Sequence, residues 1–171
     1  MTKTNSMRPV LPTDQQILVL KMMWGALFSS ILLLGVFLFI SGRFVLDSDR
    51  FRELTSQGPY LVFFVAGVVL LTARVFISNT LFQKAVEKLA LEDSQALVQA
   101  YTVPFILRLA LAEATAVAGF VCAFVFQEST GYVILGGAAA VAVIREFPTL
   151  PRIQQLARFL LSNRVSRTRG Q

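Results

Sequence analysis

The feature that most constrains this chain is a series of long apolar runs. The first extends from Met22 to Ser41 without a charged residue. Because an α-helix rises ~1.5 Å per residue, a run of this length covers the ~30 Å hydrocarbon core of a bilayer. The preceding segment is polar and contains Pro9 and Pro12. We therefore expect the run to be retained as a span rather than cleaved as a signal peptide.

Three further apolar runs predict a polytopic, all-α membrane protein with a bundle of four transmembrane helices. The predicted spans cover about residues 16–41, 58–78, 104–127 and 131–147. The third span is expected to begin near Pro104, because proline suits the first turn of a helix. In domain terms the sequence divides into a cytoplasmic N-terminal segment (1–14), a transmembrane domain (15–148) and a basic, amphipathic cytoplasmic tail (149–171).

The basic residues are unevenly distributed between the two sides of the predicted bundle. With four spans, Arg43, Arg50 and Arg52 fall on one side, and all the other Lys and Arg residues, of 16 in total, fall on the opposite side. Since basic loops stay in the cytoplasm, both termini should be cytoplasmic in a bacterial inner membrane. The same rule accounts for the net charge of +6 without nucleic acid as a partner.

Two polar stretches show the hydrophobic spacing of amphipathic helices. Residues 79–100, with Phe82 and Val86, predict either an interfacial helix or an extension of the second span. In the tail, Ile153 and Leu160 belong to a similar apolar stripe, which predicts a second interfacial helix. Basic residues in the tail would attract anionic lipid headgroups by ~1 kcal/mol each. A simpler interpretation makes them a topology signal.

The first and third spans resemble each other, which raises the hypothesis of a duplicated hairpin. Each span has a basic residue, Lys21 or Arg108, near its expected cytoplasmic end. A duplication predicts a pseudo-two-fold bundle with its axis along the membrane normal. The alternative is that any two helices leaving the cytoplasm share this pattern.

The residue inventory argues against an enzyme. There is no histidine, so the commonest general base and the Ser-His and Cys-His nucleophile pairs are missing. The one cysteine, Cys122, lies inside an apolar run, and no metal-binding spacing occurs. We predict a non-enzymatic protein without a metal or another cofactor.

Glu113 is the one acidic residue well inside a predicted span, and it is the candidate proton or ion site. An ionisable residue at this depth normally pairs, faces water or carries a proton. The hydroxyl groups of Ser29 and Ser30 are alternative structural partners for its carboxylate. Basic residues near the same membrane level are the candidate charge partners: Arg108, Arg145, Arg74 and Lys21.

Small residues predict where the helices approach closely. The fourth span, rich in glycine and alanine, should be the most tightly packed. The candidate packing residues are Gly25, Ser29, Gly119, Gly136 and Gly137.

The segment around Glu113 resembles the carboxylate helix of rotary ATPase proteolipids (subunit c). It has alanine on both sides of Glu113, and Gly119 follows six residues later. The resemblance implies a lipid-facing carboxylate that binds and releases a proton. Glu113 stands on the first helix of its hairpin, whereas the proteolipid carboxylate stands on the second. The complete layout more closely resembles uncharacterised, small four-span bacterial inner-membrane proteins.

The sequence thus predicts a small, non-enzymatic integral inner-membrane protein that acts as an accessory or interaction subunit. Its partners would be membrane lipids, with anionic headgroups at the basic tail, and either another membrane protein or further copies of itself. The alternative is proteolipid-like proton or ion translocation that uses Glu113.

Overall fold

The structure, a computed structural model, describes residues 14–87 and 94–168, with side chains for 15–87 and 96–159. These residues form six helices and no strand, which confirms the all-α class for the described part of the chain. The helices are α1 (Asp14–Ile40), α2 (Ser48–Leu54), α3 (Gly58–Val86), α4 (Ser94–Phe126), α5 (Thr130–Arg145) and α6 (Leu150–Thr168). Three predicted features lie outside the described residues: the N-terminal segment up to residue 13, residues 88–93 of the amphipathic stretch, and the basic side chains beyond 159.

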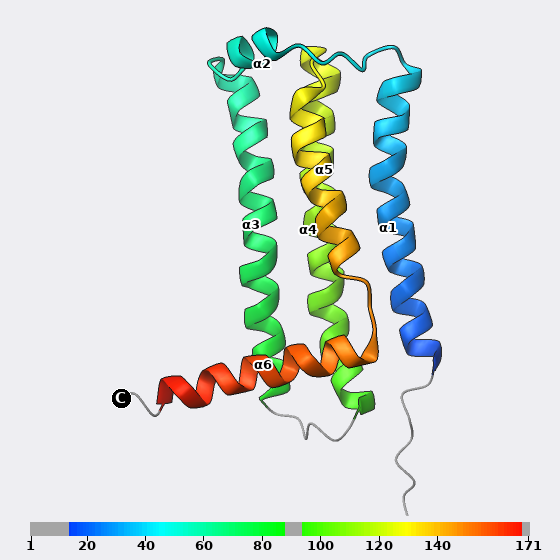
Figure 1. The fold of residues 1–171 in the computed structure, drawn as a ribbon, viewed down its shortest axis with the longest axis vertical. Coiled ribbons are helices and arrows are strands. Elements are labelled where there is room, and N and C mark those ends of the chain that lie inside the picture. The colour runs from blue at the N-terminus through cyan, green and yellow to red at the C-terminus, as the bar shows by residue number, and fades with distance from the viewer. Residues whose placement is uncertain (1–13, 88–93, 169–171) are drawn as a thin grey trace, which may run out of the picture.

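Four helices, α1, α3, α4 and α5, run side by side along the long axis of the molecule (Figure 1). The short α2 lies at one end of this bundle, and α6 crosses the opposite end almost at right angles. We call these the α2 end and the α6 end. In Figure 1, α1 and α3 lie on opposite sides of α4 and α5, so the first predicted hairpin does not pack as a pair of neighbours.

Three helices are long and apolar enough to cross a membrane: α1, α3 and α4. A fourth crossing exists only if α5 and α6, which are bent by 97° at the break between them, count together. By itself α5 has 16 residues and is therefore ~24 Å long. The described chain thus has three candidate spans, or up to four.

The helices on both sides of residues 88–93 are longer than the predicted spans. α3 continues to Val86, so residues 79–86 extend the second span, which was one of the two predicted alternatives. α4 begins at Ser94 rather than near Pro104, and Pro104 lies buried inside it. The missing N–H of a proline costs one backbone hydrogen bond, and packing against neighbouring helices makes this tolerable in membrane helices.

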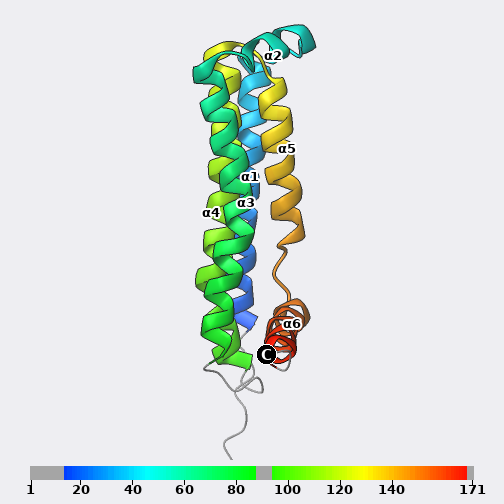
Figure 2. The ribbon, with the colours of Figure 1, turned by 90° about the vertical axis from the view of Figure 1, so that its left-hand side faces the viewer.

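The core of the α6 end consists of apolar side chains from several helices. Leu20 of α1, Phe82 of α3 and Phe105 of α4 are buried together. Ile153 and Ala157 insert the apolar stripe of α6 into the same cluster. The predicted amphipathic helix therefore packs against the sides of the last turns of α3 and the first turns of α4, below the end of α5, as Figure 2 shows.

Close packing around α5 involves some of the predicted small residues and not others. A Cβ atom at Gly119 would lie 3.1 Å from the Cα atom of Tyr132, and one at Gly136 would lie 2.9 Å from the Tyr132 ring. At Gly25 and Gly137, a Cβ atom would meet nothing within 4 Å.

Within this chain, Gly25 and Gly137 therefore bring no neighbouring helix close, and their role in packing stays a prediction, as does that of Ser29. Ser29 and Gly137 are exposed. Gly137 follows Gly136 by one residue, so it lies about 100° further round α5, away from the contact. The small residues of α5 pack on one face of the helix only.

Candidate functional site

The structure places Glu113 half-buried where α4 meets α1. The hydroxyl of Ser30 on α1 donates a hydrogen bond to its Oε1 atom, and the two oxygens are 2.6 Å apart. Ser30 is one of the two serines that the sequence offers as structural partners. The carboxylate of Glu113 forms no ion pair with any described residue.

None of the four predicted basic partners reaches Glu113. Arg108 lies about 140° round α4 from it, and both Arg108 and Arg74 turn toward Glu146. The ammonium group of Lys21 lies 5.8 Å from the ring centroid of Phe147.

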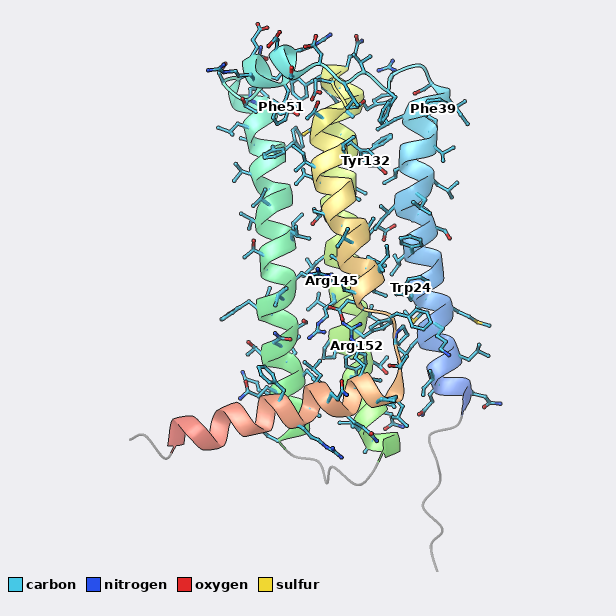
Figure 3. The ribbon with its side chains drawn as sticks, in the orientation of Figure 1. Trp24, Phe39, Phe51, Tyr132, Arg145 and Arg152 are labelled. Carbon is cyan, nitrogen blue, oxygen red and sulfur yellow. The ribbon has the colours of Figure 1, made fainter. Side chains whose placement is uncertain are left out.

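Arg145, the fourth predicted partner, is exposed at the end of α5. Figure 3 labels it close to the segment that joins α5 to α6. Lys21 lies nine positions before Ser30 on α1, and Arg108 lies five positions before Glu113 on α4. At ~1.5 Å per residue, these basic residues therefore lie closer to the α6 end than Glu113 does.

The main concentration of buried charge lies at the α6 end, around Glu146. Glu146 directly follows α5, and it is only 7% exposed. Arg108 of α4 donates from Nη1 to Oε2 over 3.0 Å. The Nη2 atom of Arg74, on α3, lies 3.9 Å from Oε1, and that of Arg152, on α6, lies 3.8 Å from Oε2. We call these four residues the Glu146 cluster.

The arginines of the Glu146 cluster are satisfied to very different degrees. Arg108 also donates from Nε to the Ser78 hydroxyl and from Nη2 to the side-chain oxygen of Asn79. In contrast, Nε and Nη1 of Arg74 are buried and have no hydrogen-bond partner among the described residues. Arg152 is more open, with 41% of its side chain exposed. One carboxylate therefore serves three guanidinium groups.

A pocket of about 280 Å³ adjoins the cluster between α4 and α6. It has a polar wall, formed by Arg108, Arg152 and Gln155, and an apolar wall, formed by Leu156 and Phe159. Figure 3 shows Arg152 on α6, close to where the linker from α5 arrives. The pocket thus combines cationic donors with an apolar surface.

A second polar residue is unsatisfied near this site. The hydroxyl of Tyr101 is buried without a hydrogen-bond partner among the described residues. The Glu146 carboxylate is close enough to act on this hydroxyl as a weak acceptor, outside normal hydrogen-bond geometry, and Arg108 and Arg152 lie within electrostatic range of it. The α6 end therefore contains two buried side chains, Arg74 and Tyr101, with donors left over.

The α2 end contains a buried carboxylate of a different kind. Glu128 is fully buried just before α5. It accepts hydrogen bonds from the Thr130 N–H at 2.7 Å, the Gly131 N–H at 3.4 Å and the Tyr60 hydroxyl at 3.2 Å. The first N–H groups of a helix are free to bind an acceptor and carry partial positive charge, so this carboxylate caps α5 without a cation.

Sequence reasoning identified Glu146 only as the end of the fourth span. Its partners come from α3, α4 and α6, and Arg74 precedes it by 72 positions in the sequence. The available signal was one acidic residue at the same expected membrane level as several arginines. Among the described residues, no group of three or more His, Cys, Asp or Glu residues could hold a metal ion.

Comparison with known protein families, with curated proteins and with solved structures finds no match for this chain.

Proposed function

We propose that this chain is a multi-pass inner-membrane protein with four spans, with α5 as the fourth and both termini in the cytoplasm. On this proposal it acts as a non-enzymatic accessory or interaction subunit, with α6 on the cytoplasmic face. Partners would be a membrane protein or further copies of the chain.

The observation that carries the proposal is the apolar surface of the long helices. Large apolar side chains on α1 and α3 point outward, among them Phe39 at 73% exposure and Phe76 at 76% exposure. Patches of this extent mark contact with lipid or with a partner. The charged residues of the Glu146 cluster and of α2 occupy the two ends instead.

The basic residues support the orientation. The segment that carries Arg43, Arg50 and Arg52 lies at the α2 end. A larger set of basic residues lies toward the α6 end: Lys21, Arg74, Lys84, Arg108, Arg145, Arg152 and Arg158. Basic residues are enriched on the cytoplasmic side of membrane proteins. The α6 end is therefore the cytoplasmic end on this proposal.

Single cysteines introduced at the two ends of the bundle test whether α5 is a span and which end is cytoplasmic. In a Cys122→Ser background, we expect Glu53→Cys on α2 to react with an impermeant maleimide in spheroplasts. We expect Arg158→Cys on α6 to react only after permeabilisation. Labelling of both positions from the same side would contradict α5 as a span, and the reverse pattern would contradict the orientation.

The same Arg158→Cys protein tests the interaction role. With a photoreactive maleimide at position 158, we expect one discrete cross-linked product in native membranes. The matched control is Val62→Cys, which places the probe on an exposed apolar position of α3. A smear of products equal to that of the control would argue against a specific partner at α6.

Glu113 supports the second candidate function, proteolipid-like proton or ion translocation. Its half-buried carboxylate meets Ser30, and Ser30 also lines an apolar groove of about 700 Å³ between α1 and α4. Ionisable residues inside membrane spans often mark proton or ion pathways, and Glu113 contacts this groove through Ser30.

Glu113→Gln separates the two functions. The accessory role predicts unchanged proton flux and a loss of about 1 kcal/mol or less of unfolding free energy, because glutamine can still accept the Ser30 bond. It also predicts that a carbodiimide leaves Glu113 unmodified. Carbodiimide modification of Glu113, together with loss of flux in the variant, would establish the carrier instead.

A further inference from the structure

The Glu146 cluster holds more positive charge than its carboxylate neutralises. Three guanidinium groups surround one carboxylate, which leaves two positive charges without a counterion in the cluster. An unpaired ion in a buried site is energetically unfavourable because it has lost its hydration. Only 8% of the Arg74 side chain is exposed, and two of its nitrogen atoms have no acceptor. A further anion would neutralise this excess of positive charge.

Two of the three arginines, Arg108 and Arg152, have donors available and line the pocket between α4 and α6, whereas Arg74 does not line it. A guanidinium has five N–H groups, and Arg108 uses three of its nitrogens once each, so N–H groups remain on it. Arg152 contacts Glu146 only at 3.8 Å, which is too far for a hydrogen bond. Both arginines line the pocket beside the amide of Gln155. Planar guanidinium groups of this kind bind phosphate oxygens well.

We propose that this pocket binds a phosphate group, with Arg152, Arg108 and Gln155 as its donors. A phosphate that takes Arg152 and the free N–H groups of Arg108 leaves the carboxylate of Glu146 to Arg74 and to Nη1 of Arg108. A phosphate monoester carries a charge of about −1.5 to −2 at neutral pH. Together with Glu146, a monoester therefore comes closest to balancing the three arginines.

The apolar wall points to a phospholipid as the source of the phosphate. Leu156 and Phe159 on α6 complete the pocket, and a free phosphate ion makes no favourable contact with apolar side chains of this kind. A lipid would place its phosphate against the arginines and the start of its acyl chains against these two side chains. This step rests on the proposed membrane insertion, which the cysteine labelling tests without any lipid-binding measurement.

The test uses the full-length protein in a neutral detergent with added lipid. Thermal unfolding is followed through the fluorescence of Trp24, the one tryptophan in the sequence. We expect phosphatidic acid to raise the melting temperature most, phosphatidylglycerol less and phosphatidylcholine least. A parallel titration with inorganic phosphate distinguishes a soluble ligand from a lipid.

Arg152→Gln is the informative variant. The Arg152 side chain is partly exposed, and removing its guanidinium leaves the Arg108–Glu146 pair intact. We expect it to weaken phosphatidic acid binding at least tenfold. The matched control is Arg158→Gln, which removes the same charge from an exposed position of α6 outside the pocket lining. It should change binding by less than twofold.

The outcomes separate the alternatives. Arg152-dependent stabilisation by inorganic phosphate alone would support the phosphate site and overturn the lipid as its source. Equal losses in the two variants would overturn the proposal, because they would show general attraction of anionic lipid to a basic helix. An equal response to phosphatidylcholine and phosphatidic acid would overturn it too.

Discussion

Two buried glutamates flank α5, and their surroundings differ. Glu128, at the N-terminal end, accepts two backbone N–H groups and a tyrosine hydroxyl and needs no cation. Glu146, at the C-terminal end, meets a helix terminus that disfavours negative charge, and arginines from three other helices surround it. At the α2 end, the carboxylate is therefore hydrogen-bonded mainly by backbone N–H groups that follow it in the sequence. At the α6 end, the carboxylate depends on arginines from distant helices, and some of their N–H groups have no acceptor.

The largest expected effect is that of Glu146→Gln. It removes the carboxylate that three guanidinium groups share, and breaking a buried ion pair in this way costs about 3–5 kcal/mol. The unfolding free energy in mixed micelles measures the loss. Arg145→Gln, at the neighbouring exposed position, should cost about 0.5 kcal/mol or less. Equal losses in the two variants would show that Glu146 does not hold the α6 end together.

The next largest effect belongs to the α2 end. A Cβ atom at Gly131 would lie 2.5 Å from the hydroxyl oxygen of Tyr60, which is fully buried. We expect Gly131→Ala to cost about 1–3 kcal/mol of unfolding free energy through overpacking. Gly137→Ala on the same helix is the control, because its Cβ meets nothing within 4 Å. A Gly131→Ala protein as stable as the control would mean that the cap around Glu128 is loosely packed.

The smallest effects are expected when one buried tyrosine hydroxyl is removed from each end of the bundle. Tyr60→Phe removes a bond to Glu128 and should cost about 0.5–1.5 kcal/mol. Tyr101→Phe removes a hydroxyl that forms no hydrogen bond of normal geometry and meets Glu146 only weakly, so stability should change by about 0.5 kcal/mol or less. Unfolding in mixed micelles again gives both values. A larger loss for Tyr101→Phe would reveal that its hydroxyl is hydrogen-bonded in the membrane, through water or lipid.

The long helices could be predicted from the sequence, because long apolar runs determine them. Runs such as 22–41 predicted the long helices, and the stripe through Ile153 predicted the helix in the tail. That helix was expected at the membrane interface, whereas in the structure its apolar stripe packs against the bundle. Helix boundaries were less accurate, because α4 accommodates Pro104 ten residues after its start at Ser94. The short α2, which the Asp47 carboxylate caps, was not predicted at all.

The site was harder to predict than the fold, because it is made by tertiary packing. Glu113 stands out in the sequence, yet its observed contact is one serine hydroxyl. Glu146 looked like a helix end, since a one-dimensional pattern does not show that Arg74 and Arg108 face the same point. Charge patterns placed the arginines and Glu146 near the same end of the bundle. They do not show which side of its helix each residue occupies.

The length of α5 has a consequence for the bilayer. With 16 residues it spans ~24 Å, whereas a hydrocarbon core is ~30 Å thick. With α5 as a span, the side of the bundle that it forms has a hydrophobic height below that of α1 and α3. Hydrophobic mismatch of this kind is relieved by local thinning of the bilayer or by tilting. The protein should therefore be more stable in nanodiscs of short-chain lipids than of long-chain lipids.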